Sequence, residues 1–357
     1  MKIAIVAGGT GGHIYPAITL ADELKNRGHE ITFIGSNDRM EKEVIPSSGY
    51  KYIGIDVETT RGGIGQKVKS LLSIGKTYFE CQKILKGFDM AIGFGNYISI
   101  PVMLAAHHMK LKTAIHEQNS YVGRANKLLD QKVDLIIGSY EENKKQFKNP
   151  NTFILGNPQA SKAKGIKKDP LVITNLGLDP NLKTVVIFMG SLGSESVNTK
   201  LVDYFKLLDG SYQVVFATGS RHYEKMKEQV KETTYLKLFE RVDGISLEVN
   251  SDLLVCRGGA TTLSEIVAVG VPAIIIPSPY VPNNHQYYNG KALVDKDAAM
   301  MIEEKDLTGQ LLFDKVNSII NDSARLSSLR KNARSLANDN VVEDIINKLE
   351  SLWLMNS

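Results

Sequence analysis

Cysteine is scarce in this chain of 357 residues, and neither sign of charge is in large excess. The two cysteines, Cys81 and Cys256, lie far apart and lack the spacing of metal ligands. We therefore expect two ordinary thiols, without a disulfide framework or a zinc site. The net charge of +4 and the absence of any nucleic-acid-binding motif argue against a nucleic-acid partner.

Long hydrophobic runs are also missing. No apolar stretch reaches the roughly 18 residues of a membrane-spanning helix, and the run Ile3–Ala7 is too short for the core of a signal peptide. We expect a cytoplasmic protein without a membrane span. Because 43% of the residues are apolar and no low-complexity segment occurs, the chain should fold into globular domains.

What the chain does contain is an alternation of short apolar strands with helical patterns. In the first half, the predicted strands are Lys2–Val6, Ile31–Ile34, Met90–Ile92, Thr113–Ile115, Leu135–Ile137 and Thr152–Leu155. In the second half, they are Thr184–Met189, Gln213–Ala217, Leu236–Phe239, Asp252–Val255 and Ala273–Ile276. This alternation predicts two α/β domains, each a Rossmann-like parallel sheet covered by helices, which face each other across a cleft.

A small, basic segment with two prolines, residues 155–171, separates the two halves. It has no apolar period, so we interpret it as a linker. The N-terminal domain is expected at residues 1–160 and the C-terminal domain at residues 161–336. The last residues, 337–357, should form a helix that packs back on the N-terminal domain.

The stretch CRGGATTLSEIVAVGVP, residues 256–272, combines a strand end, a turn at Gly258 and Gly259, and a helix that begins at Ala260. A helix N-terminus has unpaired N–H groups and a positive dipole end, which stabilise a bound anion. Glu265 follows one turn later, where a carboxylate can bind the hydroxyls of a ribose. The pattern predicts a site for a nucleotide diphosphate, although an ordinary strand-to-helix turn can have the same residues.

The glycine run GGTGGH, residues 8–13, departs from the dinucleotide pattern GxGxxG, and no acidic residue ends the second strand. Both features argue against an NAD site. The run still offers the backbone N–H groups of Gly11 and Gly12, the Thr10 hydroxyl and the His13 imidazole at the carboxyl edge of a parallel sheet. The alternative for His13 is local packing at a helix start.

Two further turns in the first half are rich in polar residues or glycine. The motif HEQN, with Glu117 and Asn119, and the turn GFGNYISIP, with Tyr97, each follow a predicted strand. Polar residues at strand ends are typical of binding sites, but helix capping explains them equally well.

Similar turns occur in the second half. Gly190, Ser191 and Gly193 form a backbone nest suited to a phosphate. Gln286 and Asn289 lead into a helix, and their amides can both donate to and accept from sugar hydroxyls. A simple turn and ordinary helix capping are the competing explanations.

The segment Arg61–Lys86 holds six basic residues against one acidic residue, Glu80, with apolar side chains on one helical stripe. A basic amphipathic helix can lie on an anionic membrane surface, but most such stripes face a protein core. Asp295 and Asp297 have the spacing of a metal-binding aspartate pair. They fall in a charged loop and not at a strand end, so we expect no catalytic metal.

Five motifs, GGTGGH, HEQN, GNP, CRGGATTLSE and NHQYYN, occur in this order over nearly the whole chain. Together they resemble the MurG family, bacterial transferases that move N-acetylglucosamine (GlcNAc) from UDP-GlcNAc onto lipid I to form lipid II in peptidoglycan synthesis. The resemblance implies the GT-B glycosyltransferase fold, with UDP-GlcNAc in the C-terminal domain and lipid I in the N-terminal domain. It also implies an enzyme without a cofactor, bound peripherally to the anionic surface of the cell membrane on its cytoplasmic side.

The resemblance assigns donor contacts to five residues of the second half. Ser191 and Thr262 would contact the diphosphate, and Glu265 the ribose. Gln286 would contact the GlcNAc hydroxyls. Asn289, on the same predicted helix, is a further candidate for binding the substrate. The segment FERVDGI resembles the family's FIDDM, so the backbone near Val242 would meet the uracil.

In the first half, the residues that match positions lining the family's cleft are Thr10, His13, Tyr97, Glu117 and Asn119. The implied reaction is an inverting displacement, in which the C4 hydroxyl of the acceptor's N-acetylmuramic acid attacks C1 of GlcNAc and UDP leaves. We expect His13 to be the base, because the unperturbed histidine pKa of about 6.5 suits proton transfer near neutral pH, with Glu117 in reserve. Ser191, Thr262 and Arg257 would stabilise the departing diphosphate.

Three short segments depart from the family pattern. An arginine usually follows GNP, whereas this chain has Ala160 and Ser161 there, so that Lys162 or Lys164 would have to supply the charge. Met189 stands where a glycine usually precedes Gly190, and Phe94 and Asn96 interrupt a turn that is usually richer in glycine. These changes affect the details of substrate contacts.

Other functions remain open at this point. Another UDP-sugar enzyme of the same fold, such as a UDP-GlcNAc 2-epimerase or a glycolipid synthase, would have similar motifs. A non-catalytic nucleotide-sugar binding module would bind UDP-GlcNAc without turnover. An oxidoreductase fits least, because the glycine run lacks the dinucleotide pattern.

Overall fold

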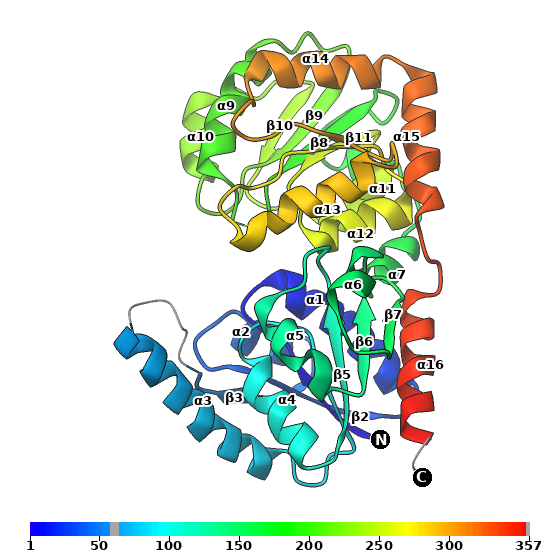
Figure 1. Cartoon of the computed structure of the whole chain (residues 1–357). Coiled ribbons are helices and arrows are strands. Elements are labelled where there is room, and N and C mark those ends of the chain that lie inside the picture. The colour runs from blue at the N-terminus through cyan, green and yellow to red at the C-terminus, as the bar shows by residue number, and fades with distance from the viewer. Residues whose placement is uncertain (58–63, 191, 355–357) are drawn as a thin grey trace. The chain divides into compact units, whose positions relative to one another are not determined.

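The computed structural model describes residues 1–57, 64–190 and 192–354, with the backbone alone for residues 64–72. The chain divides into two compact units (Figure 1). Unit 1 contains Met1–Ser161 and Asn340–Ser357, and unit 2 contains Lys162–Asp339. Unit 2 thus begins within the predicted linker, and the last segment of the chain belongs to unit 1.

The described residues of unit 1 form a seven-stranded sheet in which all neighbouring strands are parallel. Its strands are β1 (Lys2–Val6), β2 (Glu30–Ser36), β3 (Lys51–Ile55), β4 (Met90–Gly93), β5 (Lys112–Glu117), β6 (Leu135–Gly138) and β7 (Thr152–Ile154). Their spatial order is β3-β2-β1-β4-β5-β6-β7. The apolar residues of β1 are fully buried because helices cover both faces of the sheet.

The helices of unit 1 are α1 (Gly11–Asn26), α2 (Glu41–Ser47), α3 (Ile64–Ile84), α4 (Ser99–His108), α5 (Arg124–Leu129), α6 (Glu142–Gln146) and α16 (Val341–Leu354), with the 3-10 helix η1 (Asp130–Lys132). α3, α4 and α5 share one buried apolar cluster with the sheet. α16 packs against α1 and β5. The C-terminal helix therefore completes the N-terminal unit.

The described residues of unit 2 form a six-stranded parallel sheet with the order β10-β9-β8-β11-β12-β13. Its strands are β8 (Thr184–Phe188), β9 (Gln213–Ala217), β10 (Leu236–Phe239), β11 (Leu253–Cys256), β12 (Ala273–Ile275) and β13 (Met300–Met301). The helices are α8 (Leu171–Thr174), α9 (Glu195–Lys206), α10 (Tyr223–Gln229), α11 (Gly244–Asn250), α12 (Ala260–Val269), α13 (His285–Val294), α14 (Gly309–Ile320) and α15 (Ser323–Ser335), with η2 (Pro282–Asn284). A further helix, α7 (Gln159–Lys164), spans the division between the units.

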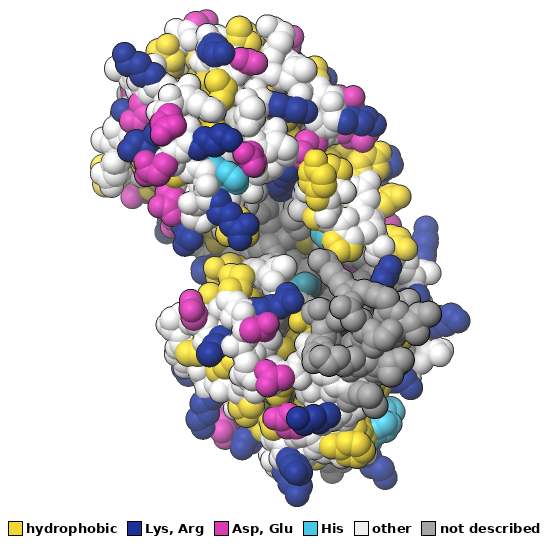
Figure 2. Space-filling model, turned by 90° about the vertical axis from the view of Figure 1, so that its left-hand side faces the viewer, with side chains coloured by type: hydrophobic (Ala, Val, Ile, Leu, Met, Phe, Trp, Pro, Cys, Tyr) yellow, Lys and Arg dark blue, Asp and Glu magenta, His cyan; other side chains and the backbone are white. Residues whose placement is uncertain are grey.

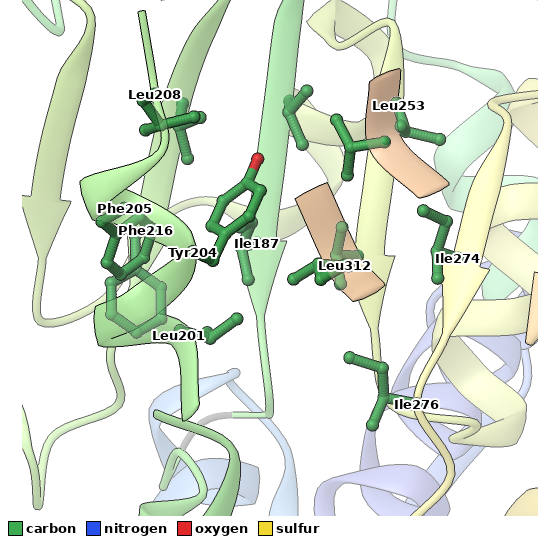
Figure 3. Packing of buried hydrophobic residues seen from close by; sticks show 14 of the residues in the cluster. Ile187, Leu201, Tyr204, Phe205, Leu208, Phe216, Leu253, Ile274, Ile276 and Leu312 are labelled. Atoms are coloured by element: carbon green, nitrogen blue, oxygen red, sulfur yellow. The ribbon is translucent and has the colours of Figure 1, made fainter. Parts of the chain in front are cut away.

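Two apolar clusters hold the sheet of unit 2 between its helices. In one, Leu201 and Phe205 of α9 point toward Ile187 of β8 and Phe216 of β9 (Figure 3). Leu312 of α14 closes the same cluster. The other cluster joins the opposite face of the sheet to α8, α11, α12 and α13. These helices fix the turns at the ends of β8 and β11.

The sequence prediction missed two edge strands, β3 and β13. β3 reads KYIGI, and its first four residues are exposed or only half-buried. β13 contains two residues and pairs with β12 alone. Edge strands are covered less completely than central ones, so neither has the continuous apolar run that identified the other strands.

Charged side chains of both signs are interspersed on the face shown in Figure 2. No helix among the described residues is long and apolar enough to cross a membrane. Cys81 and Cys256 are free and buried, and burial raises the pKa of the Cys81 thiol to about 12. Both are therefore inert, structural thiols.

Candidate active site

Both sheets have the strand order of a Rossmann-like fold. The first three strands of each unit are added toward one edge of the sheet, and the later strands are added on the other side of the first strand. This change of direction lies between β1 and β4 in unit 1, and between β8 and β11 in unit 2. Ligands of such sheets bind outside the carboxyl ends of the strands at this point. The turns that the sequence singled out follow β1, β4 and β5 in unit 1, and β8, β11 and β12 in unit 2.

The turn after β11 lies against the start of α13. A Cβ atom on Gly258 would come within 2.2 Å of the Gln286 carbonyl oxygen, so only glycine fits there. Asn289 Nδ2 donates a hydrogen bond to the Gly258 carbonyl oxygen at 3.1 Å. Asn289, which was predicted to bind the substrate, is fully buried and supports the turn through this bond.

α12 begins directly after this turn, as predicted. Its N-cap is Gly259, which has no side chain to accept a hydrogen bond from the N–H groups of the first turn. Thr262 lies in that turn and is half-buried. The helix ends at Val269 and is capped by Gly270, whose φ of 74° is the left-handed conformation common after helices. The first turn of α12 therefore has the backbone geometry for an anion.

Glu265 lies one turn further along α12 and is only 6% exposed. Its carboxyl group is hydrogen-bonded to that of Glu248 on α11, which is 1% exposed. Burial, and then the neighbouring Glu265, raises the pKa of Glu248 well above its usual range. Local sequence patterns did not predict this pair, because the two residues lie on different helices.

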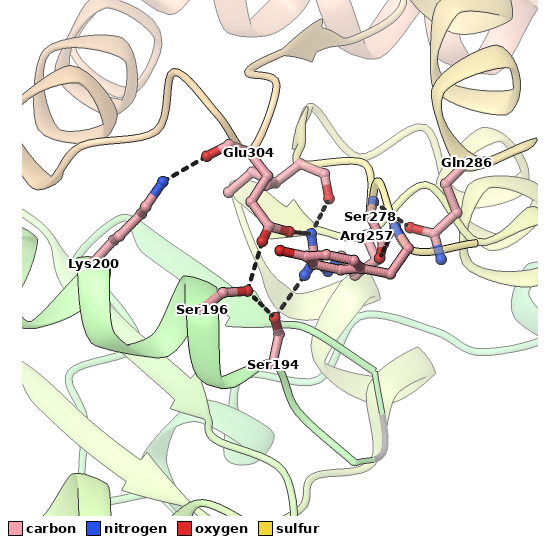
Figure 4. A network of polar contacts seen from close by, with 9 residues as sticks. Ser194, Ser196, Lys200, Arg257, Ser278, Gln286 and Glu304 are labelled. Carbon is pink, nitrogen blue, oxygen red and sulfur yellow. Dashed lines mark hydrogen bonds and ion pairs between the residues drawn. The ribbon is translucent and has the colours of Figure 1, made fainter. Parts of the chain in front are cut away.

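Arg257 follows β11, and protein groups bind its guanidinium (Figure 4). Nη1 donates to Glu304 Oε2 at 2.6 Å and to the Ile276 carbonyl oxygen at 3.1 Å. Nη2 donates to Ser194 Oγ at 2.6 Å. Arg257 was predicted to stabilise the diphosphate, but Glu304 neutralises its charge, and the two side chains are 11% and 6% exposed. We therefore assign Arg257 a supporting role.

The same network reaches α9 (Figure 4). Ser196 Oγ donates to Glu304 Oε1 at 2.6 Å, and Lys200 Nζ donates to the Glu304 carbonyl oxygen at 2.6 Å. Ser194 is the N-cap of α9. Arg257 and Glu304 therefore hold the turn between β8 and α9. Glu304 follows the undetected strand β13, so the sequence did not point to it.

The predicted phosphate nest after β8 surrounds Ser191, which itself lies outside the described residues. Gly190 and Gly193 on either side have φ values of 87° and 75°. Glycine is favoured in this left-handed conformation, which brings successive N–H groups together in a nest. A Cβ atom on Gly193 would lie 2.0 Å from the Thr218 carbonyl oxygen, so the turns after β8 and β9 are in direct contact.

Gln286 and Val242 lie in the segments that follow β12 and β10. Gln286 is half-buried in the first turn of α13, where Oε1 accepts a hydrogen bond from the Ser278 N–H at 2.9 Å. The Nε2 group points away from the polar network in Figure 4. Val242 is half-buried and precedes Asp243, the N-cap of α11.

In unit 1, the glycine turn after β1 packs against Asn96 and Glu41. A Cβ atom on Gly9 would lie 1.8 Å from Asn96 Nδ2, so no other residue fits at Gly9. Asn96 Nδ2 donates to the Gly8 carbonyl oxygen at 2.9 Å, and the Gly9 N–H donates to Glu41 Oε2 at 3.0 Å. Glu41 is 1% exposed and holds the turn, but it lies in a polar run that gave no signal.

His13 lies in the first turn of α1, which begins with Gly11 and Gly12. Its Nδ1 is 3.1 Å from the hydroxyl oxygen of Thr10, the N-cap. Its Nε2 is 3.3 Å from the position of a Cβ atom on Gly95. The structure thus brings Thr10, His13 and the turn after β4 together.

In the turn after β4, Gly95 and Asn96 both have left-handed φ values, 86° and 65°. Asparagine tolerates this conformation better than most residues, which explains how Asn96 replaces a glycine. Tyr97 is half-buried, with the Arg39 guanidinium 5.6 Å from the centre of its ring. Burial raises the pKa of Tyr97, so its phenol is neutral at pH 7.

The Glu117 carboxylate is 2% exposed and accepts four hydrogen bonds. The donors are Asn119 N at 3.0 Å, Asn119 Nδ2 at 3.3 Å, Gly123 N at 2.9 Å and Asn126 Nδ2 at 2.8 Å. Burial raises the pKa of Glu117, and these donors oppose the rise. A carboxylate bound in this way is suited to holding the loop after β5, together with Asn119, and poorly placed to take a proton from a substrate.

His116 belongs to the core of unit 1. Its ring stacks on Phe94, with the centroids 5.2 Å apart, and its Nε2 donates to the Gly156 carbonyl oxygen at 2.9 Å. Nδ1 accepts from Gln118 Nε2 at 3.1 Å. Burial lowers the pKa of His116 to about 4, so the ring is neutral at pH 7. The histidine that lines the glycine turn is therefore His13.

Several charged residues near the predicted site are engaged elsewhere. Lys164 lies 3.6 Å from Asp339, whereas Lys162 is exposed. Lys162 is therefore the better candidate for the charge that an arginine usually supplies.

Asp297, one of the two aspartates with the spacing of metal ligands, is paired with an arginine. Its two carboxylate oxygens accept hydrogen bonds from Arg325 at 2.7 Å.

Comparison with known proteins decides the family. The glycosyltransferase family 28 N-terminal domain matches residues 3–137, and the C-terminal domain of the same family matches residues 184–349. A protein from Caldanaerobacter subterraneus subsp. tengcongensis is 37% identical, and the match covers 94% of this chain and 96% of that protein. Its name is UDP-N-acetylglucosamine--N-acetylmuramyl-(pentapeptide) pyrophosphoryl-undecaprenol N-acetylglucosamine transferase. The chain belongs to the MurG family.

A second relative with the same name, from Lactiplantibacillus plantarum, is 35% identical over 99% of both chains. The crystal structure of MurG from Acinetobacter baumannii has a TM-score of 0.79 at 22% identity, covering 98% of this chain and 99% of that chain. The predictions of the MurG family, of the GT-B fold and of an N-acetylglucosamine transferase are therefore confirmed. A UDP-N-acetylglucosamine 2-epimerase structure also matches, with a TM-score of 0.68 at 12% identity, so the fold alone does not separate these activities.

Proposed function

We propose that this enzyme transfers GlcNAc from UDP-GlcNAc to the C4 hydroxyl of the N-acetylmuramic acid of lipid I, with inversion at C1. The observation that carries the donor assignment is the start of α12: a glycine N-cap, Thr262 in the first turn and Glu265 one turn later. The helix N-terminus stabilises the diphosphate and the UDP that leaves. Thr262 donates its hydroxyl to the same group, and the nest around Ser191 adds further N–H donors.

The rest of the donor extends from this helix. Glu265 accepts hydrogen bonds from the ribose hydroxyls, and the backbone near Val242 pairs with the uracil. Gln286 binds the sugar with Nε2, because its Oε1 is committed to the Ser278 N–H. Arg257 and Glu304 act indirectly, through the turn that follows β8.

Replacing Glu265 with alanine should raise the donor KM by about tenfold or more, because a hydrogen-bonded carboxylate typically contributes one to two powers of ten in binding. The acceptor KM should change little. Steady-state kinetics with each substrate varied in turn checks this, with Glu228→Ala on the exposed face of α10 as a control. An unchanged donor KM in Glu265→Ala would remove Glu265 from the donor site.

In unit 1, His13 takes the proton from the attacking hydroxyl. If Nδ1–H donates to the Thr10 hydroxyl, the basic lone pair is on Nε2, on the side of the turn after β4. Tyr97 and the N–H groups of Gly11 and Gly12 form the surroundings of the acceptor sugar. Glu117 and Asn119 hold the neighbouring loop.

Transfer of labelled GlcNAc from UDP-GlcNAc to a lipid I analogue tests the function directly. Product that forms only with the acceptor, together with release of UDP, supports the transferase. Conversion of UDP-GlcNAc without acceptor would indicate an epimerase. Binding of UDP-GlcNAc without any product would indicate a binding module.

We also propose that the enzyme binds the cytoplasmic side of the membrane peripherally through α3, because its acceptor carries a lipid tail. On the described part of this helix, Lys76, Phe79 and Lys83 follow each other at helical spacing, and Phe79 is 65% exposed. Tyr78, predicted to share the apolar stripe, packs instead toward α4, where its hydroxyl is 2.7 Å from His108 Nδ1. Lys67 and Lys69 lie where only the backbone is described, and Arg61 lies outside the described residues.

Changing Lys76 and Lys83 to glutamate should reduce sedimentation with phosphatidylglycerol vesicles by about tenfold or more. Each lysine near an anionic surface contributes about 1 kcal/mol, and glutamate adds repulsion. The double variant Lys231→Glu and Lys331→Glu makes the same charge change at exposed positions of unit 2 and serves as the control. Equal sedimentation of both variants would show that α3 is not the docking surface.

A further inference from the structure

Two carboxyl groups meet between α11 and α12, which pack against each other in unit 2 (Figure 1). Glu248 is 1% exposed and Glu265 is 6% exposed, and their carboxyl groups are hydrogen-bonded to each other. An ionised carboxylate can only accept hydrogen bonds, so this bond requires a proton on one of the two groups. The pair therefore shares a single negative charge.

The surroundings place the proton on Glu248. Among the described residues, no donor reaches its buried Oε2 atom. It is also near the C-terminal end of α11, where the helix dipole disfavours a negative charge. Glu265 lies on the longer helix α12 and is somewhat more exposed. Glu248 is thus the member of the pair at which a negative charge is less favourable.

The titratable groups that face this pair strengthen the assignment. Asp243, the N-cap of α11, repels a second negative charge at Glu248. Cys256 on β11 faces both carboxyl groups, and burial and the two glutamates raise the pKa of its thiol. α8 and β8, which also pack against α11, contain no titratable residue. Burial, then Glu265 and Asp243, accordingly raise the pKa of Glu248 well above its usual range.

We propose that Glu248 is a positioning residue for the nucleotide: as a neutral acid it donates its O–H to Glu265 and fixes the ionised Glu265 carboxylate to accept both ribose hydroxyls. This inference rests on the proposed function of Glu265. An ionised carboxylate has about four acceptor sites on its two oxygens, so the bond with Glu248 is compatible with hydrogen bonds from both the 2′- and 3′-hydroxyls. Glu248 thereby makes the site selective for a vicinal diol.

The test is to measure Kd for UDP and for 2′,3′-dideoxy-UDP by calorimetry on the full chain. The wild type should prefer UDP. Glu248→Leu removes the donor and should reduce this preference by roughly tenfold, whereas Glu248→Gln retains an N–H donor and should keep most of it. Leu247→Ala, on the same helix but in the apolar core, controls for loosening of α11 and should leave the preference intact.

Glu265→Ala separates this inference from the proposed function. If Glu265→Ala keeps the preference for UDP, the ribose role of Glu265 is wrong, and the inference falls with it. If Glu265→Ala loses the preference but Glu248→Leu keeps it, only the inference is overturned. If both lose it, and the double variant is no worse than Glu265→Ala, Glu248 acts through Glu265.

The proton itself has a separate readout. The native state keeps a proton on Glu248 that the unfolded chain releases above about pH 4.3, so the free energy of unfolding should fall as the pH rises from there toward the raised pKa. Glu248→Gln carries no such proton and should lack this fall, becoming more stable than the wild type at pH 8. Equal pH dependence in the two proteins would show that Glu248 is not protonated.

Discussion

His13→Ala should lower kcat by about a hundredfold to ten-thousandfold, because general base catalysis typically contributes an effect of this size. The donor KM should stay close to that of the wild type, because the groups assigned to UDP-GlcNAc lie in unit 2 and His13 lies in unit 1. Single-turnover transfer to a lipid I analogue measures the chemical step, and calorimetry with UDP measures donor binding. His107→Ala, an exposed histidine on α4, is the matched control.

The hydroxyl of Thr10, which lies beside the His13 ring, provides a second test of His13 as the base. Thr10→Val removes the hydroxyl that lies 3.1 Å from Nδ1 and should lower kcat by less than His13→Ala does, since the base remains but loses its orientation. Near-normal turnover in His13→Ala would remove the assignment. If Glu117→Gln then abolished turnover without loss of stability, the base would be Glu117.

Local sequence patterns predicted the central strands and the turns at their ends. β1 and β9 begin and end where they were predicted to, because strands buried on both faces read as continuous apolar segments. The start of α12 was also predicted correctly, because Gly258 and Gly259 separate an apolar strand from a helical pattern. The family motifs then supplied roles that the pattern alone left open.

Contacts between residues far apart in the chain were not visible in the same way. Glu304 meets Arg257 across 47 positions, and Glu41 meets Gly9 across 32 positions. Each of these glutamates stands in a charged or polar run typical of a solvated surface, and nothing in the local pattern shows that the fold buries it. Because Glu304 could not be recognised as its partner, Arg257 was predicted to face the ligand. In the structure, the buried carboxylate of Glu304 neutralises the charge of Arg257.

Replacing Glu304 with glutamine should lower the free energy of unfolding of unit 2 by about 3 kcal/mol, because it leaves the Arg257 guanidinium buried without a counter-charge. This corresponds to a decrease in Tm of roughly 6–12 °C for a domain of this size. Thermal unfolding followed by circular dichroism checks the prediction. Glu303→Gln is the control, since Glu303 pairs with the exposed Lys305 and should barely affect Tm.

The double variant Arg257→Met and Glu304→Leu tests how the pair acts. Replacing both charges with apolar groups removes the buried unpaired charge, so much of the lost stability should return. The turn between β8 and α9 would still lack the bond from Arg257 to Ser194, so the donor KM should remain moderately raised. If stability returns but UDP no longer binds at all, Arg257 contacts the diphosphate directly, and its supporting role is wrong.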